Sequence, residues 1–139
     1  EKIFHKNALE NVFFAVKITG NFSHVKTRAV AAQKRPYPTL AEVADKQAIF
    51  EEDNSQGTVI GYFSPELFQG MASAGFHLHY LNDNKTMGGH LLDFTVSEGS
   101  LAIQPFASVE QHFPLEDQEF MQHNFELSKM DSEIRHSES

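Results

Sequence analysis

Short runs of apolar, β-branched and aromatic residues, separated by turn-forming residues or proline, recur along the first part of the chain. Such runs are typical of β-strands, and tight connections between them favour antiparallel pairing. Turns are predicted at Gly20–Asn21, joining two strands as a hairpin, and at Asp53–Gly57. The pattern predicts strands at residues 12–19, 22–30 and 59–62, a hairpin over residues 75–94, and a last strand at 100–104 that Pro105 ends.

Helix signals lie between and after these strands. Thr39 and Glu42 form a capping-box pattern that predicts a helix to about Gln47. Further short helices are predicted at Glu1–Leu9, from Ser64–Pro65 to about Gln69, and from Ser128 to about His136. We therefore predict a single α+β domain over residues 1–139, built on a mixed, largely antiparallel β-sheet with a few peripheral helices.

Composition narrows the classes of protein. With 139 residues, 40% apolar content and thirteen phenylalanines, the chain can bury a real core. A net charge of -8 and scattered basic residues argue against a nucleic-acid partner. No apolar run is long enough to span a bilayer, and signal-peptide features are absent, so we expect no membrane partner and favour a cytoplasmic location over secretion. The missing initiator methionine suggests a trimmed or partial chain.

Three histidines in the predicted hairpin give the chain its candidate chemistry. His77 and His79 are two residues apart on a strand, so their side chains point to the same face while Leu78 points to the other. The turn-forming residues 82–85 would fold the chain back and bring His90 close to His79 on the returning strand. Three imidazole nitrogens would then converge on one point.

A site with three protein ligands and an open position is typical of catalytic zinc, whereas structural zinc sites have four ligands and are rich in cysteine. This chain has no cysteine. Gly88 and Gly89 remove side chains beside the expected metal, as close backbone approach would require. The pattern therefore indicates a catalytic Zn²⁺ site, in which Asp93 is a candidate hydrogen-bond acceptor for a ligand imidazole.

Three other interpretations fit the same histidines. One is zinc-dependent hydration or hydrolysis of the carbonic-anhydrase type. The second is a cupin-like iron oxygenase, although Asp83, the carboxylate nearest the paired histidines, lies in the turn. The third is a non-enzymatic metal- or ligand-binding module with structural histidines. The remaining histidines of the chain lack a partner at ligand spacing, so we interpret them as surface or hydrogen-bonding residues.

Three motifs together resemble the α-acetolactate decarboxylase family. They are Gly-Tyr-Phe-Ser-Pro at residues 61–65, Gly-Phe-His-Leu-His-Tyr at 75–80 and Gly-Gly-His-Leu-Leu-Asp at 88–93. Residues 12–20, Arg28, Arg35–Pro38 and residues 57–61 also look like that family, so the resemblance covers nearly the whole chain. It implies decarboxylation of 2-acetolactate to acetoin and carbon dioxide with a zinc ion held by His77, His79 and His90.

The resemblance also implies roles for residues outside the histidine motif. Arg28 matches the family's active-site arginine, and Glu138 matches a glutamate near the family's C-terminus that folds back to the metal, with Glu133 as the fallback. Members of the family carry a further N-terminal region that supplies another active-site glutamate and contributes to a homodimer. The resemblance therefore implies that this chain is the C-terminal, metal-binding catalytic half of such an enzyme, inactive as a fragment if that region is essential.

Overall fold

The structure is a computed structural model that describes residues 9–138, with the side chains of all of these except residues 40, 41, 131 and 135–138. The predicted helix at Glu1–Leu9 lies outside the described residues. The elements in chain order are β1 (Phe14–Ala29), α2 (Leu40–Ala44), β2 (Ala48–Ser64), the 3₁₀ helix η1 (Glu66–Phe68), β3 (Gly75–Asn82), β4 (Gly88–Pro105), α3 (Gln118–Gln122) and α4 (Leu127–Glu138).

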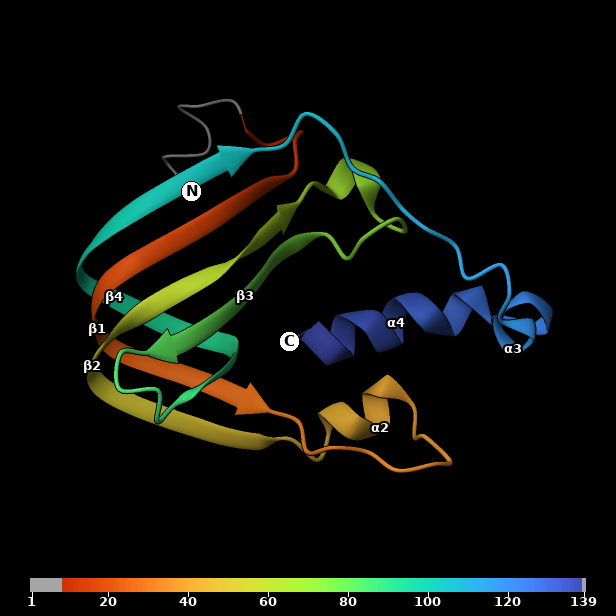
Figure 1. Ribbon diagram of the computed structural model, residues 1–139, viewed down its shortest axis with the longest axis horizontal. Coiled ribbons are helices and arrows are strands. Elements are labelled where there is room, and N and C mark those ends of the chain that lie inside the picture. Colours follow the sequence, from red (N-terminus) through yellow and green to blue (C-terminus); the bar gives the residue numbers. More distant parts are fainter. Residues whose placement is uncertain (1–8, 139) are drawn as a thin grey trace.

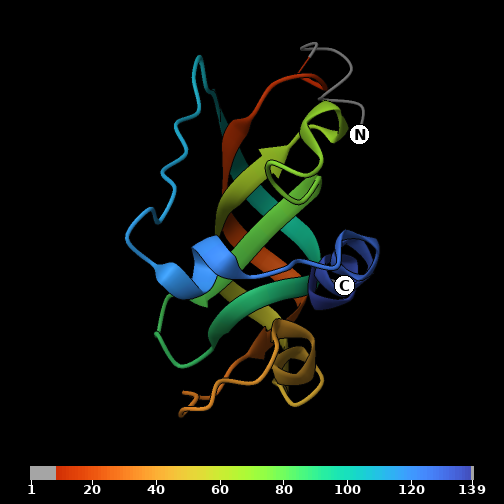
Figure 2. The same cartoon turned by 90° about the vertical axis from the view of Figure 1, so that its right-hand side faces the viewer.

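The four strands form a closed barrel in the order β1-β2-β3-β4, with β4 pairing back to β1. Every pairing of these strands is antiparallel. Figure 1 shows that β1, β2 and β4 bend sharply, so that each runs through two arms of a V, with the helices at its open side. From that side, Figure 2 shows α3 and α4 in front of the strands. The predicted α+β class with a largely antiparallel sheet is confirmed.

Both predicted turns, at Gly20–Asn21 and at Asp53–Gly57, are wrong. Residues 12–19 and 22–30 do not form a hairpin, because β1 runs through Gly20, and β2 likewise runs through Gly57. Gly20 pairs with Gly57 on one side and with Gly99 on the other. A Cβ atom on Gly20 would lie 2.2 Å from the carbonyl oxygen of Glu98. These glycines therefore allow neighbouring backbones to approach closely where the strands bend, so here glycine marks a bend within a strand and not a turn.

The core lies inside the barrel, where side chains from all four strands meet. Its buried members are Phe22, Val25, Val59, Tyr80 and Leu91. The rings of Phe22 and Tyr80 pack edge to face with centroids 5.2 Å apart. The hydroxyl of Tyr80 forms a 2.5 Å hydrogen bond with that of the buried Ser55, so the one polar atom of this ring is satisfied. Because the core occupies the inside, the other face of each strand is available for chemistry.

The helices agree with the sequence in part. The capping box is present, since the Glu42 carboxylate accepts a hydrogen bond from the Thr39 backbone N–H at 2.8 Å and the Glu42 N–H donates to the Thr39 hydroxyl at 3.4 Å. The helix it begins ends earlier than predicted, at Ala44. Helix α3 was not predicted, although Asp117 caps it by accepting a hydrogen bond from the Phe120 N–H at 3.0 Å. Within residues 9–138, every helix is too short or too polar to cross a bilayer.

Candidate metal centre

The histidine hairpin has the geometry that its sequence predicts. His79 on β3 lies directly opposite His90 on β4. Leu78 points to the other face and packs against the barrel core, so His77 and His79 share the outer face. The side chains of His77 and His79 are exposed and that of His90 is half-buried. The three rings come from two paired strands and meet with centroids 4.9, 5.2 and 5.6 Å apart.

The nitrogen positions suit a metal ion. In the described part of the chain these three histidines form the group that could hold one, with a ligand atom of each within 4.8 Å of the others. The Nε2 atoms of His77 and His79 are 3.3 Å apart. Two imidazole nitrogens on a tetrahedral zinc ion, each at about 2.0–2.1 Å, are separated by roughly 3.3 Å. Three imidazoles on an exposed face fit a zinc ion that keeps an open position for a small molecule.

Gly88 and Gly89 let the hairpin pack closely against its neighbours. A Cβ atom on Gly88 would lie 2.9 Å from the carbonyl oxygen of Tyr80, and one on Gly89 would lie 2.4 Å from that of Arg28. Gly89 also has a φ of +146°, which side-chain-bearing residues rarely adopt. The predicted close backbone approach is therefore present, but the backbone that each glycine meets belongs to an adjacent strand.

Replacing Gly89 by alanine is expected to destabilise the fold by more than the matched change at Gly70. Gly70 has a φ of +101° with open space around it, so Gly70→Ala tests backbone strain alone, about 1–3 kcal/mol. Gly89→Ala adds a backbone clash and is expected to cost about 1–3 kcal/mol more. Urea unfolding of both variants measures the difference. Equal losses would show that the barrel relaxes around the added methyl group.

Arg28 lies beside the histidines through the pairing of β1 with β4. It is directly opposite His90, which in turn is opposite His79, so the three residues form a row across three strands. Residues directly opposite in an antiparallel pair have Cβ atoms about 4.5–5.5 Å apart. The side chain of Arg28 is only 8% exposed. The structure therefore places a buried, permanently cationic group next to the histidine cluster.

His24 and Lys26 lie on the same face of β1 as Arg28, because the intervening Val25 and Thr27 are fully buried. Lys26 forms an ion pair with Glu51 at 3.3 Å. His24 Nδ1 lies 2.8 Å from a carboxylate oxygen of Asp53, and this hydrogen bond raises the pKa of His24 above its ordinary value of 6.5. His24 is thus a hydrogen-bonding residue outside the histidine cluster, in agreement with the sequence.

The raised pKa of His24 predicts a pH-dependent contribution to stability. Protonated His24 is favoured in the folded chain, so the His24–Asp53 contribution is fully present below about pH 6.5 and is lost as the pH rises through the folded-state pKa. Asp53→Asn should return the pKa of His24 toward 6.5, which NMR titration of the imidazole measures. The free energies of unfolding of Asp53→Asn and of the unmodified chain should differ most below about pH 6.5, where His24 is protonated. An unchanged titration midpoint would show that Asp53 does not cause the shift.

The structure gives less support to the predicted roles of the carboxylates of Asp93, Glu133 and Glu138 than to those of the histidines. Asp93 lies opposite Lys26 and accepts a hydrogen bond from the Phe94 backbone N–H at 2.9 Å, so its role as acceptor for a ligand imidazole stays a prediction. Glu133 is exposed on α4. The side chain of Glu138 lies outside the described residues, but Figure 1 shows the C-terminal end of α4 pointing into the space between the arms of the V.

Sequence reasoning missed two apolar neighbours of the ligands. Tyr62 pairs with His77 and Ile60 pairs with His79 across β2 and β3, and both side chains are 57% exposed. The signal was present in residues 59–62, where apolar residues occupy both faces of one strand although only one face can point into the core. Ile60 and Tyr62 give the histidines an apolar border on the open face of the sheet.

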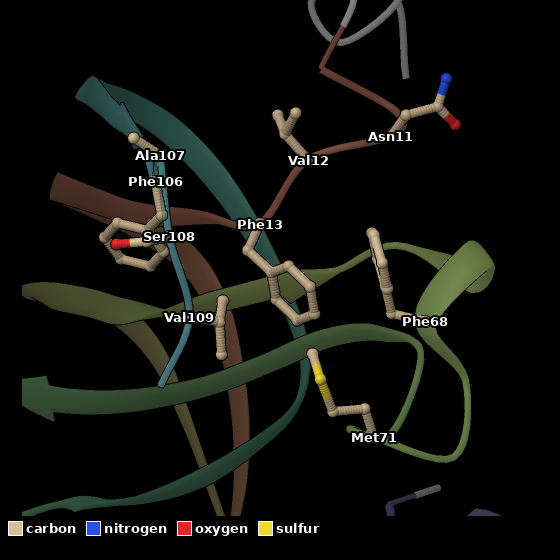
Figure 3. Close-up of a pocket in the computed structure, with 9 residues that line it drawn as sticks. All are labelled: Asn11, Val12, Phe13, Phe68, Met71, Phe106, Ala107, Ser108 and Val109. Carbon is tan, nitrogen blue, oxygen red and sulfur yellow. The ribbon is translucent and has the colours of Figure 1, made fainter. Parts of the chain in front are cut away.

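A separate apolar pocket lies at the end of the barrel away from the hairpin turn. It has a volume of about 330 Å³, and Figure 3 shows Phe13, Phe68 and Met71 gathered at its centre. None of its lining residues has an ionisable side chain. The pocket therefore lacks the groups for acid–base or metal chemistry, and the histidine cluster is the candidate site. The residues that line the apolar pocket come from the segments before β1, around η1 and after β4, namely Asn11, Val12, Phe13, Phe68, Met71, Phe106, Ala107, Ser108 and Val109.

Similarity to known proteins covers nearly all of the chain. The curated α-acetolactate decarboxylase of Streptococcus thermophilus is 34% identical over 128 residues, which are 92% of this chain and 53% of that protein. The enzyme of the same name from Brevibacillus brevis is 44% identical over 108 residues, which are 78% of this chain and 38% of that protein. The chain thus spans about half the length, or less, of these curated relatives.

Solved structures agree in fold. A Staphylococcus aureus protein of unknown function, described as similar to α-acetolactate decarboxylase, has a TM-score of 0.86 at 37% identity, over 98% of this chain and 60% of that one. The α-acetolactate decarboxylase of Bacillus subtilis strain 168 has a TM-score of 0.87 at 29% identity, over 97% of this chain and 58% of that one. The sequence model of the alpha-acetolactate decarboxylase family matches residues 1–127. The chain therefore belongs to the α-acetolactate decarboxylase family.

Proposed function

We propose that residues 1–139 are the metal-binding half of an enzyme that converts 2-acetolactate to acetoin and carbon dioxide, with Zn²⁺ held by His77, His79 and His90. The convergence of three imidazoles beside a buried arginine, in a chain of this family, carries the proposal. Because the chain spans about half the length of its curated relatives, we propose this activity for a full-length protein, which we expect to be a homodimer.

The reaction needs stabilisation of negative charge more than it needs a strong base. When the bond between C2 and the carboxylate carbon breaks, carbon dioxide leaves and the electron pair moves into the adjacent ketone, which gives an enediolate. A proton then adds to C2 and yields acetoin. A zinc ion held by His77, His79 and His90 would supply Lewis-acid chemistry that stabilises this negative charge, and an open position beside three imidazoles would suit that role.

Arg28 and Glu138 are the proposed catalytic residues. The Arg28 guanidinium has a planar fork of donors that suits a carboxylate or an enediolate oxygen, and its burial strengthens such a charge interaction. Its place opposite His90 puts it at the edge of the ligand cluster. Glu138 at the end of α4 is the proposed proton donor or relay for C2, with Glu133 as the alternative.

The first test is elemental mass spectrometry of protein purified without a metal-affinity step, followed by acetolactate turnover in the full-length protein. We expect about one zinc per chain and release of acetoin with carbon dioxide. Iron in place of zinc would favour an oxygenase. A full-length protein that holds zinc but does not decarboxylate acetolactate would refute the substrate assignment, and a metal-free full-length protein would refute the metal site.

A further inference from the structure

The pairing that brings His79 opposite His90 is short. Strands β3 and β4 share three register pairs, His79 with His90, Tyr80 with Gly89, and Leu81 with Gly88. Side chains alternate faces along a strand, so a slip of one residue would turn His90 to the opposite face. Two glycines in three pairs add no side-chain contacts to hold the register. The pairings of β3 with β2 and of β4 with β1 hold these strands from their other edges, but the β3–β4 ladder has little of its own to fix its register.

Asn82 supplies a constraint on this register at the end of β3. Its side chain is 4% exposed and lies at the start of the loop that joins the two strands. Its Oδ1 atom accepts hydrogen bonds from the backbone N–H groups of Thr86 at 2.8 Å and Met87 at 3.1 Å. Its Nδ2 atom donates to the Thr86 hydroxyl at 2.8 Å and to a Glu52 carboxylate oxygen at 3.3 Å. One buried amide thus ties β3 to both the loop and β2.

The backbone of Asn82 closes the same loop. Its N–H donates to the carbonyl oxygen of Met87 at 3.0 Å, and its carbonyl oxygen accepts from the N–H of Lys85 at 3.0 Å. Lys85 adopts the left-handed conformation, with a φ of +57°. Residues 82 and 87 are therefore held at a fixed spacing directly before β4 begins. Within an antiparallel hairpin, the loop connection sets the register of the strands that follow.

We propose that Asn82 is the positioning residue of the metal centre: by fixing the β3–β4 register, it places His90 opposite His79. The inference rests on the proposed metal site for its functional meaning. Asn82 itself is not a ligand, because its side chain points to the loop and to β2. Supporting groups that orient ligands are typically worth about 10–100-fold in metal affinity, and a comparable loss is expected here when the amide is removed.

The test combines metal affinity with a metal-free measurement of register. Zinc affinity is measured by competition with a chromogenic chelator for the unmodified chain, Asn82→Ala, and a control, Thr39→Ala, which removes a side-chain cap at α2. Asn82→Ala should weaken zinc binding about 10–100-fold, and Thr39→Ala should leave it unchanged. In the metal-free chain, the cross-strand NOE between the α-protons of His79 and His90 should weaken only in Asn82→Ala.

A conservative variant separates positioning from general stability. Asn82→Asp combined with Glu52→Gln keeps a side-chain acceptor for the two loop N–H groups and a donor amide facing it from β2, so zinc affinity and the NOE should largely return. If circular dichroism shows Asn82→Ala unfolded, Asn82→Ser replaces it, because a serine hydroxyl is too short to hold both N–H groups. Unchanged zinc affinity and an unchanged NOE in the folded variant would overturn the inference.

Failure of the proposed metal site has a different signature. It would appear as an unmodified chain, and a full-length protein, that bind no zinc. The NOE then decides the inference on its own: its loss in Asn82→Ala supports a register-setting role, and its persistence overturns that role.

Discussion

His79→Ala is expected to lower the zinc affinity of the chain by about 100-fold. A complete four-ligand zinc site supplies about 10–16 kcal/mol, so the loss of one ligand costs about 3 kcal/mol, which corresponds to about 100-fold. His79 neighbours both other histidines, with its Nε2 atom 3.3 Å from that of His77 and its backbone opposite His90. The two remaining imidazoles cannot by themselves hold the ion in a three-ligand geometry.

The same variant should leave the metal-free fold almost unchanged. His79 is exposed and its strand neighbour Leu78 makes the core contacts, so the change in the free energy of unfolding should stay within about 0.5 kcal/mol. Added zinc should raise the melting temperature of the unmodified chain but not that of His79→Ala at the same concentration. The two melting curves, with and without zinc, therefore separate loss of a ligand from loss of the fold.

His24→Ala is the matched control for His79→Ala. His24 is a histidine on another strand of the same barrel, and its ring is held by Asp53. Its replacement should leave zinc affinity unchanged within about twofold. If His79→Ala kept full zinc occupancy at limiting metal, the ligand assignment would be wrong, and an equal loss in His24→Ala would point to unspecific binding by histidines.

The histidine cluster could be predicted from the sequence because its geometry depends on residues that are close together in the chain. The two-residue period of a strand puts His77 and His79 on one face, and a single turn brings His90 beside them. Arg28 is different, because its position depends on the pairing of β1 with β4, strands that are far apart along the chain. In the sequence, only the family resemblance connected Arg28 with the histidines.

Glycine was the main source of error in the fold. Gly20 and Gly57 occur beside asparagine, serine or glutamine, a composition that also marks turns, so local sequence does not distinguish a reversal from a bend in a long strand. The difference lies in what approaches the glycine, here the backbone of β4 at Gly20 and the ring of Tyr80 at Gly57. Closure of the barrel could not be predicted from local sequence either, because it depends on contacts between strands that are far apart along the chain.

Arg28→Ala, made in the full-length protein, should reduce kcat/KM for acetolactate by about 10²–10³-fold, or about 3–4 kcal/mol of transition-state stabilisation. Arg28 is 8% exposed and lies in the row with His90 and His79, beside which the proposed reaction would develop negative charge. Zinc content should stay full, because arginine remains protonated and is not a metal ligand. Steady-state kinetics together with zinc analysis of the same sample measure both effects.

Lys26→Ala is the control for a change of charge on this face. Lys26 lies on the same strand as Arg28 but is ion-paired with Glu51 and more exposed, so its removal should change kcat/KM by less than about threefold. Full turnover in Arg28→Ala, with zinc in place, would remove Arg28 from the proposed reaction. Its buried side chain would then be a structural member of the β1–β4 pairing.

Arg28→Lys distinguishes a fork of donors from a simple positive charge. Lysine keeps the charge but cannot make two parallel hydrogen bonds to a carboxylate, and its shorter head group would leave part of the buried space unfilled. We expect this variant to recover less than about a tenth of the activity that Arg28→Ala loses. Recovery of most of the activity would mean that Arg28 acts through its charge on the enediolate, and that orientation of the substrate carboxylate belongs to another residue.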